Sequence, residues 1–436
     1  MLAFIFPGQG SQRTGMGTAW MEQPSFEIVD EAGDILKRDI RHLLLNAPPD
    51  DLKDTANAQI ATFVMSLVVL DSIERIGLSP TWCAGHSLGE YTALVAGGYM
   101  SFEDGLGLVQ ERGDAMRVAG ERHPGTMAAL MGIGDQEADT ACRLADDDVW
   151  VANFNAPGQV VISGSHEGVR HAIEIAKSLG ARKALELQVS GAFHTPLMAE
   201  AKDRLRKAIA GVTWETSEVP VVANVDAMPH DNPAQWPTIL SAQLTNPVRW
   251  HQSLTTLSDL GAACFIEVGP GGVLSGLARR VLPEHKVISA GTPDDVANLI
   301  EEIAGNELVS HHGDNHAGES LTISEKLIVT TVTGIFKPRS DLAGVIPGPG
   351  ASLPRAASPV HASGNAQPDA ISGGGTGGPP AIISPQGTAI GVGEEIGYVG
   401  DAPVMTPFEG NLVGFLAHAN EKVVAGQPVA WMRTKS

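Results

Sequence analysis

The sequence predicts an α/β fold with a hydrolase-like parallel-sheet core, an inserted small lobe and a C-terminal all-β module. Three observations support this prediction. A strand-turn-helix pattern around residues 80–96 matches the nucleophile elbow of parallel-sheet enzymes. Residues 126–189 favour the order β-α-β-β-α-β, which is the ferredoxin-like plan. The segments 330–334 and 406–410 both begin with threonine and end with glycine. This repeat suggests two copies of one element, as in an all-β module built from two similar halves.

Length and charge limit what the chain can be. Its 436 residues suggest two or three domains, and the formal net charge is −21 with a pI near 5.0. This acidic balance argues against a general surface for nucleic acid or anionic membranes. The N-terminal run 1–6 has no basic region typical of a signal peptide, and no apolar run is expected to reach membrane-spanning length. We therefore expect a cytoplasmic protein.

The cysteines indicate a reducing compartment. Cys83, Cys142 and Cys264 are scattered, and each lies in an apolar run, so we expect buried free thiols. The sequence has no CxxC motif. The histidines between residues 311 and 316 lie in a polar stretch typical of a linker. We predict no metal site and no cofactor.

The strand Leu2–Phe6 opens the core and leads into a tight loop at residues 7–12. Such a loop places polar groups at the carboxyl edge of a parallel sheet, where open α/β sheets bind ligands. Gln9 could donate a hydrogen bond to an oxyanion there, although a plain turn would have the same sequence. The apolar segment Gln59–Ile76 has helical period and should pack beside the elbow.

The elbow itself is the segment 85–91, with sequence GHSLGEY. Residues 80–84 favour a short buried strand, and residues 90–96 favour a helix. Glycines flank Ser87 because a side chain on either would crowd the turn. Ser87 would then lie at a helix N-terminus, where backbone N–H groups face an oxyanion. The alternative is an ordinary serine in a glycine-rich turn.

A serine needs a base to become nucleophilic, and histidine is the usual one near neutral pH. His86 is next to Ser87, but neighbouring side chains diverge in an elbow, so it would rather support the turn. His194 follows a strand end and opens a helix, which allows it to face a cleft. Arg112 lies on a helix that a Ser101–Asp104 capping box begins. By pattern alone this arginine is a solvated surface charge.

After the lobe, the sequence predicts a helix ending near Ile209, a strand at Val219–Val225, a loop and helix start at 243–250, a strand at 264–268 and a helix at 274–281. The composition becomes polar past residue 305. Residues 337–388 are dominated by Pro, Gly, Ala and Ser and cannot bury a core. We predict these boundaries: a domain at 1–305 with the lobe at 124–190, a linker at 306–324, and a β module at 325–436 that contains the second linker, 337–388.

Several motifs occur together and in order: FPGQGSQ at 6–12, GHSLGEY at 85–91, QERG at 110–113, NAPGQVVISG at 155–164, GAFHTPLM at 191–198, NPVRW at 246–250 and EVGPG at 267–271. Together they resemble the malonyl-CoA:acyl-carrier-protein transacylases of fatty-acid synthesis, which are related to polyketide acyltransferase domains. The resemblance covers residues 1 to about 300. It implies an S-malonyltransferase with malonyl-CoA and acyl carrier protein as partners.

The resemblance also implies roles for particular residues. Ser87 would accept the malonyl group, and His194 would act as its base. Gln9 and the backbone N–H of Leu88 would form the oxyanion hole. Arg112 would pair with the malonyl carboxylate, for which its planar fork is better suited than lysine. The backbone carbonyl of Gln243 would orient the histidine.

Further positions carry over for substrate and partner binding. Phe193 before the histidine resembles malonyl-selecting members, whereas relatives that use branched malonyl groups carry a smaller residue there. Asn155 and His86 would also lie at the substrate. Arg279 and Arg280 match the position that contacts the acidic carrier protein.

The C-terminal module resembles a biotinyl/lipoyl-type domain, most clearly at 404–410 and 420–429. That family attaches its cofactor to a lysine at a hairpin tip. Here the tip is the segment 400–403, with sequence GDAP and no lysine. We therefore expect no biotin or lipoate. The module would be a docking unit, directed at another protein of malonyl-CoA supply or fatty-acid synthesis.

The resulting hypothesis is a two-step malonyl transfer through Ser87. One alternative is a serine hydrolase or thioesterase built on a similar elbow, against which Arg112 argues. Another is a binding scaffold with a degenerate acyltransferase domain, against which the intact serine, histidine, arginine and glutamine argue. The carrier protein, and the choice between fatty-acid and polyketide synthesis, stay open.

Overall fold

The computed structural model describes residues 1–189, 191–304, 323–329, 334–339, 388–391, 394–406, 410–415, 422–423 and 428–435. Its contacts divide the chain into two compact units, the first made of residues 1–74 and 78–313 and the second of residues 314–436 with the short segment 75–77. Each unit is described by itself. The polar stretch with the histidines at 311–316 and most of the expected linker at 337–388 lie outside the described residues.

A six-stranded sheet forms the centre of the N-terminal unit. Its order is β10 (Lys286–Ala290), β9 (Cys264–Val268), β1 (Leu2–Phe6), β2 (Trp82–Gly85), β7 (Val221–Val222) and β8 (Pro229–His230). The first five strands are parallel, and only β8 runs antiparallel to its neighbour. The parallel core predicted from the sequence is therefore confirmed.

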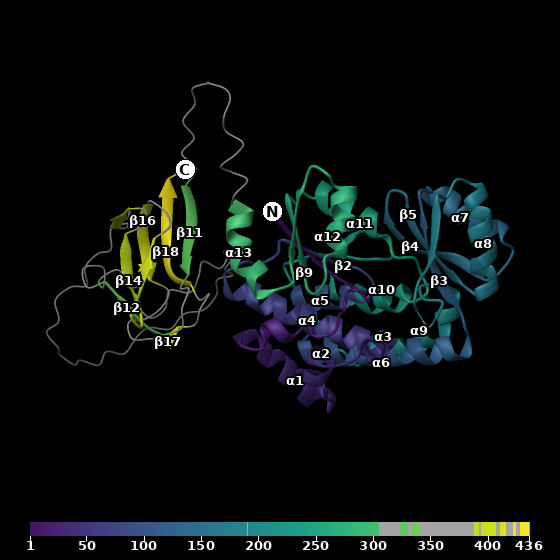
Figure 1. Cartoon of the computed structure of the whole chain (residues 1–436), viewed down its shortest axis with the longest axis horizontal. Coiled ribbons are helices and arrows are strands. Elements are labelled where there is room, and N and C mark those ends of the chain that lie inside the picture. The colour runs from purple at the N-terminus through teal and green to yellow at the C-terminus, as the bar shows by residue number, and fades with distance from the viewer. Residues whose placement is uncertain are drawn as a thin grey trace, which may run out of the picture. The chain divides into compact units, whose positions relative to one another are not determined.

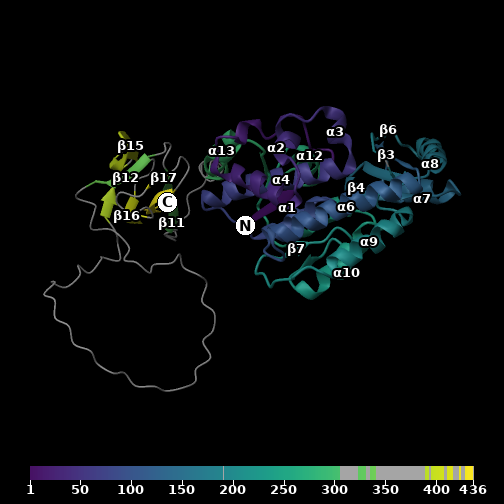
Figure 2. The same ribbon diagram turned by 90° about the horizontal axis from the view of Figure 1, so that it is seen from below.

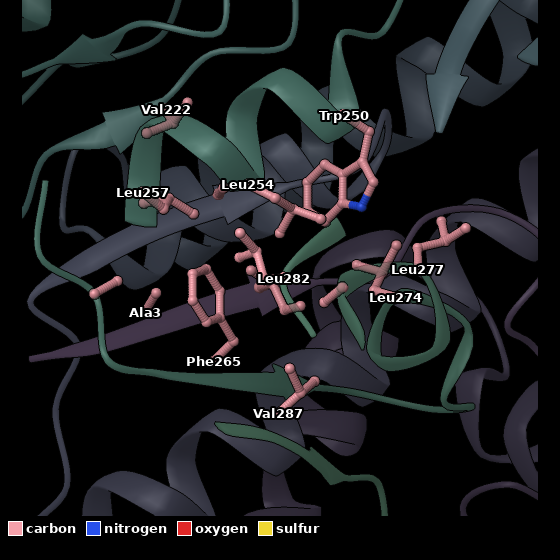
Figure 3. Close-up of a cluster of buried hydrophobic side chains, with 14 of the residues drawn as sticks. Ala3, Val222, Trp250, Leu254, Leu257, Phe265, Leu274, Leu277, Leu282 and Val287 are labelled. Carbon is pink, nitrogen blue, oxygen red and sulfur yellow. The ribbon is translucent and has the colours of Figure 1, made fainter. Parts of the chain in front are cut away.

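Helices cover both faces of this sheet (Figure 1). Alternate residues of a strand point to opposite faces. Ala3 and Ile5 of β1 accordingly join one apolar cluster with residues of α11 (Trp250–Asp259) and α12 (Val273–Val281). Figure 3 shows this cluster, in which Trp250 lies beside Leu274 and Leu277. The opposite face carries α4 (Thr55–Arg75) and α5 (Gly89–Ala96) (Figure 1).

Helix α4 corrects one expectation. Among the described residues it is the one helix long and apolar enough to cross a membrane by length and composition, although the sequence was expected to contain no such run. Its most apolar 18-residue window is 83% buried within the fold. Burial on all sides explains why the helix is apolar around its whole circumference, so we interpret it as a core helix.

The remaining helices frame the core. They are α1 (Glu27–Leu36), α2 (Ile40–Leu45), α3 (Pro49–Lys53), α6 (Phe102–Arg122), α9 (Ala199–Ile209), α10 (Trp236–Gln243) and α13 (Pro293–Ala304), with short 3-10 turns at Thr18–Trp20, Pro24–Phe26, Pro196–Met198 and Pro233–Gln235. Helices α6, α9 and α10 lie side by side (Figure 2). They bring Arg112 of α6 and Gln243 of α10 toward the elbow.

The small lobe is an antiparallel sheet covered by two helices. Its elements are β3 (Thr126–Met131), α7 (Asp135–Leu144), β4 (Val149–Ala156), β5 (Gln159–Gly164), α8 (His166–Ser178) and β6 (Lys183–Glu186), and the sheet order is β4-β5-β3-β6. This is the β-α-β-β-α-β order that the sequence predicted. The N–H of Phe154 in β4 donates to the carbonyl of Val248, which ties the lobe to the core.

Two predicted elements differ in extent. The strand expected at 219–225 is only Val221–Val222, because Asn224 turns out of the sheet and bonds to the elbow instead. Residue Gln243 was placed in a loop, but it ends helix α10. A proline lies in the first turn of α10, where its missing N–H costs the helix nothing.

The C-terminal unit contains two four-stranded antiparallel sheets. One has the order β11 (Ile323–Val329), β18 (Pro428–Lys435), β16 (Gly410–Phe415) and β13 (Thr388–Ile390). The other has the order β15 (Ala402–Met405), β14 (Glu395–Val399), β12 (Gly334–Pro338) and β17 (Lys422–Val423). Both sheets contribute to one apolar cluster, which includes Ile328, Phe336, Ile396 and Leu412.

Candidate active site

The turn between β2 and α5 has the geometry of a nucleophile elbow. Ser87 has φ +53°, a left-handed conformation that is unusual for a residue with a side chain. A Cβ on Gly85 would lie 1.9 Å from the backbone of Gly89, and a Cβ on Gly89 would lie 2.0 Å from the carbonyl oxygen of Phe6. Both positions therefore require glycine, as the sequence predicted.

His194 lies directly against the serine. Its Nε2 is 2.8 Å from the Ser87 Oγ, and its Nδ1 is 3.0 Å from the backbone oxygen of Gln243. Because a carbonyl can only accept, Nδ1 carries the proton and Nε2 is free to accept the serine proton. Burial, reinforced by the nearby Arg112 cation, lowers the pKa of His194 to about 3. The imidazole is therefore neutral near pH 7 and competent as a base.

Arg112 is buried, only 1% exposed, and does not have the solvated position that its pattern alone favoured. Its guanidinium donates to the Gln59 Oε1 at 2.6 Å, to the Gln243 Oε1 at 3.1 Å and to the Ser87 Oγ at 3.0 Å. It also lies 5.4 Å from the centre of the Tyr91 ring. Burial lowers the pKa of Arg112 from its usual high value. A cation is thus held in contact with the nucleophile.

A small cavity of about 210 Å³ opens onto these groups. Its walls come from the loop after β1, the elbow, the lobe and α12, and they include Gly8, Gln9, Ser87, Arg112, Met116, Asn155, Gln159, Phe193, His194, Val273, Leu274 and Leu277. Leu88 is the N-cap residue of α5, so its backbone N–H belongs to the first turn beside Ser87. The structure thus brings the predicted Gln9, Ser87, Leu88, Phe193 and His194 together around one space.

His86 also lines the cavity, as expected for a residue near the substrate, but its ring contacts the lobe and α11. Its Nε2 is 2.8 Å from the Asn155 Oδ1, and its ring packs edge-on against Trp250 at 5.4 Å. Burial lowers the pKa of His86. His86 therefore links the elbow to strand β4 of the lobe, which agrees with the expectation that it supports the turn rather than acting as the base.

Sequence reasoning missed three buried polar residues behind the serine: Gln59, Glu90 and Asn224. Asn224 accepts from the Ser87 N–H at 2.7 Å, Glu90 binds Asn224 and Gln243, and Gln59 binds Arg112. Glu90 lies within the GHSLGEY motif, which was its only signal in the sequence. Gln59 and Asn224 are unremarkable in sequence, and their roles come from hydrogen bonds to residues far away along the chain.

The two candidate docking arginines lie outside the cavity, in the last turn of α12. Both are exposed. Arg279 donates to the Val287 carbonyl at 2.9 Å, and Arg280 donates to the Gln159 Oε1 at 2.6 Å. Because Gln159 and α12 both line the cavity, Arg280 lies at its rim.

A larger cleft of about 880 Å³ also reaches His194, between α7, β4 and residues 245–249. Four aspartates, at 139, 146, 147 and 148, and two arginines, at 143 and 249, line it. Ser87 and Arg112 line the smaller cavity and not this cleft, so we assign the smaller cavity as the candidate active site. Among the described residues, no group of three or more His, Cys, Asp or Glu could hold a metal ion.

Comparison with known proteins agrees with this geometry. Residues 3–292 match the model of the acyl transferase domain. The chain belongs to the acyl transferase family. It is 39% identical over 308 residues to the malonyl CoA-acyl carrier protein transacylase of Bacillus subtilis, covering 69% of this chain and 97% of that protein.

Solved structures of other family members are similar as well. The acyl-carrier-protein S-malonyltransferase of Burkholderia pseudomallei is 39% identical, with a TM-score of 0.67, and the match covers 69% of this chain and 99% of that one. A malonyl-transacylase solved in complex with a type II polyketide acyl-carrier protein is 34% identical, with a TM-score of 0.66 over 69% of this chain and 99% of that one. The acyl transferase core of this family therefore occupies the N-terminal unit.

Proposed function

We propose that the chain transfers malonyl from malonyl-CoA to the phosphopantetheine thiol of acyl carrier protein through a malonyl ester on Ser87. The 36–39% identity to malonyl CoA-acyl carrier protein transacylases supports this acyltransferase activity. The observation that carries the residue assignment is the buried Arg112, whose guanidinium lies 3.0 Å from the Ser87 Oγ. A hydrolase of simple esters has no use for a desolvated cation at its nucleophile.

In the first step, the Ser87 Oγ attacks the thioester carbonyl while the His194 Nε2 takes its proton. The carbonyl oxygen becomes an oxyanion, which Gln9 and the Leu88 N–H would stabilise. When this intermediate collapses, the carbon–sulfur bond breaks and the CoA thiolate takes the proton from His194. The products of this step are CoA and a malonyl ester on Ser87.

In the second step, the pantetheine thiol of the carrier protein gives its proton to His194 and attacks the ester carbonyl. The bond to the Ser87 Oγ breaks, and the serine recovers the proton from His194. The Gln243 carbonyl holds the imidazole through Nδ1 in both steps, so that Nε2 faces the reacting atoms. Within the part of the chain that the structure describes, the Nδ1 partner of the histidine is this backbone carbonyl and not a carboxylate.

Arg112 would select the substrate. In the free site its Nη2 donates to the Ser87 Oγ and to Gln243. A malonyl carboxylate would accept two parallel hydrogen bonds from this guanidinium. The Gln59 Oε1, which accepts from Nη1, would keep the guanidinium in place. The Phe193 ring and Met116 narrow the same cavity, which favours an unbranched malonyl group.

Carrier-protein docking would use Arg279 and Arg280 at the cavity rim. Their exposure and their place at the end of α12 support this assignment in an otherwise acidic chain. Residues 1–305 would form the catalytic domain, with 124–190 as its lobe. Three buried free cysteines support a cytoplasmic location. We further propose that the module at 325–436 is biotinyl/lipoyl-like and docks another protein of malonyl-CoA or fatty-acid metabolism.

The decisive experiment is incubation of the protein with radiolabelled malonyl-CoA, with and without holo acyl carrier protein. We expect label on the protein alone, and transfer of the label to the carrier when it is added. Release of free malonate at the rate of CoA release would favour a thioesterase. No labelling at all would favour a binding scaffold.

A further inference from the structure

Glu90 is a fully buried carboxylate on the first turn of α5, three residues after the nucleophile. A buried carboxylate is costly unless both oxygens find donors. Here each oxygen has one. The Oε1 accepts from the Asn224 backbone N–H at 2.6 Å, and the Oε2 accepts from the Gln243 Nε2 at 2.5 Å.

Both partners of Glu90 hold the nucleophile's own peptide groups. The Asn224 side chain accepts from the Ser87 N–H at 2.7 Å and donates to the Gly85 carbonyl at 2.6 Å. The Gln243 Nε2 donates to the Ser87 carbonyl at 2.8 Å. Asn224 thus holds the left-handed backbone of Ser87 at its N–H, and Gln243 holds it at its C=O. Glu90 accepts a hydrogen bond from each of these two residues.

Gln243 also holds the other two reacting groups. Its backbone oxygen accepts from His194 Nδ1, and its side-chain Oε1 accepts from Arg112 Nη2. Asn224 follows β7 and Gln243 ends α10, so these residues come from separate elements and have no direct covalent link to the elbow. A displacement of Gln243 as a whole would therefore affect the base through its backbone oxygen and the arginine through its side chain.

We propose that Glu90 is a positioning residue for the transfer: its carboxylate fixes Asn224 and Gln243, and through them Ser87, His194 and Arg112. Glu90 touches no reacting atom, so it acts through these partners. This inference rests on the proposed malonyl transfer and deepens it, because it links the geometry of the base to that of the carboxylate-binding arginine.

The network requires an acceptor on both sides of Glu90. An amide of the same shape offers one acceptor and one donor. In Glu90→Gln, either the Asn224 N–H or the Gln243 NH₂ would therefore face another donor. Rotating the Gln243 amide by half a turn would relieve that contact, but it would aim an NH₂ group at Arg112. Every arrangement thus loses at least one hydrogen bond of the network that holds the reacting groups.

The chain offers a matched control. Glu267 is also fully buried at a strand end, and its carboxylate also accepts from two backbone N–H groups, those of Leu274 at 3.1 Å and Ser275 at 2.6 Å. Its bonds cap α12 and do not reach Ser87, His194 or Arg112. Glu267→Gln therefore removes a comparable buried carboxylate without touching the network.

The test compares the wild type, Glu90→Gln and Glu267→Gln in three assays: the acylation rate with malonyl-CoA, the acylation rate with acetyl-CoA, and labelling by a fluorophosphonate probe. Because misplacement of reacting groups by about 1 Å can cost on the order of 10²-fold in rate, we expect Glu90→Gln to lose on that scale in all three assays. Glu267→Gln should keep rates near the wild-type values per folded molecule.

Several outcomes would overturn the proposal: acylation by folded Glu90→Gln at close to the wild-type rate, a loss no larger than that of Glu267→Gln, or a loss confined to KM. Should Glu90→Gln not fold, Glu90→Asp decides by the same assays, because it keeps the charge but is too short to reach both donors. A wild-type protein that takes no malonyl label would contradict the proposed function instead, and probe labelling would still report on Glu90.

Discussion

Two tight turns of this chain share a left-handed backbone conformation but differ in their chemistry. Ser87 in the β2–α5 elbow has φ +53°, and Gly400 in the β14–β15 hairpin has φ +62°. Ser87 is surrounded by buried partners that bind its N–H, its C=O and its hydroxyl. Gly400 and Asp401 at the hairpin tip are exposed. A turn geometry alone therefore predicts little, and the side chains around it decide what it can do.

The sequence motif was informative in the two turns for opposite reasons. At the elbow, the serine proposed to perform the chemistry is present, and a histidine and an arginine contact its hydroxyl. At the hairpin, the lysine that biotinyl/lipoyl domains modify is missing from a tip whose sequence is GDAP. The predictions below test each side of this contrast, beginning with the elbow.

The largest effect is expected at the nucleophile. Ser87→Ala should abolish covalent malonyl labelling, since it removes the hydroxyl that lies 2.8 Å from the His194 Nε2. His194→Ala should reduce labelling by about 10²–10⁴-fold, the usual contribution of a general base. Acid-stable counts from radiolabelled malonyl-CoA measure both. Labelling that survives in Ser87→Ala would show that the elbow is not the acylated site.

The next effect distinguishes substrates. Arg112→Ala should reduce kcat/KM for malonyl-CoA by a factor that corresponds to about 3–5 kcal/mol, because the buried carboxylate would lose its counter-ion. Acetyl transfer needs no counter-ion and should fall much less. Arg112→Lys keeps the charge but loses the fork, so it should lie between wild type and alanine. Equal losses for malonyl and acetyl would remove Arg112 from carboxylate binding.

Much of this site was predictable from the sequence, and what was missed has a common cause. Ser87, Gln9, Arg112 and His194 lie in recognisable motifs, and the structure brings them together around one cavity. Gln59 and Asn224 have no such signal, because their roles arise from contacts 53 and 137 residues away along the chain. By pattern alone, Arg112 was expected to be a solvated surface charge, whereas it is buried.

The fold shows the same limit. The parallel core and the order of the lobe elements followed from strand and helix patterns. Helix α4 was expected as a helix, but it was not expected to be long and apolar enough to cross a membrane. It has no polar face because it is buried on every side. Helix α10 was not predicted, and its last residue, Gln243, was placed in a loop; the helix begins at Trp236 with a proline, which a first helical turn tolerates well.

Burial should also make the elbow sensitive to acid. The pKa of His194 is lowered to about 3 in the folded chain, from 6.5 when exposed. Between these values the unfolded chain binds a proton that the folded chain does not, so this stability is lost as the pH falls below 6.5. At pH 5 the loss should be on the order of 2 kcal/mol relative to pH 8.

Urea unfolding of wild type and His194→Gln at pH 8 and pH 5 measures this contribution. All other titrating groups are common to both proteins, so the difference between their pH dependences isolates the imidazole. The wild type should lose more stability toward pH 5 than the variant does. Parallel pH dependences would mean that the pKa of the imidazole is not lowered in the folded chain.

The smallest effect is expected at the hairpin, where we predict no covalent attachment of a cofactor and therefore no change in mass. Biotin and lipoate are attached through a lysine that a ligase can reach, and positions 400–403 offer none. Lys337 lies within β12, opposite Tyr398, and Lys422 lies within β17, opposite Ile335, so neither lysine is part of the β14–β15 hairpin tip. The intact mass of protein purified from its native host should therefore equal that of the bare chain. A biotin or lipoyl increment on any C-terminal lysine would overturn this assignment.

Deleting residues 306–436 tests the same side of the comparison through activity. Every residue assigned to the two chemical steps lies before residue 250, and their hydrogen bonds join residues within the N-terminal unit. Malonyl acylation of Ser87 should therefore proceed at the rate of the full chain, measured per folded molecule by circular dichroism and labelling together. A truncated protein that folds but takes no label would show that residues 306–436 contribute to acylation at the elbow.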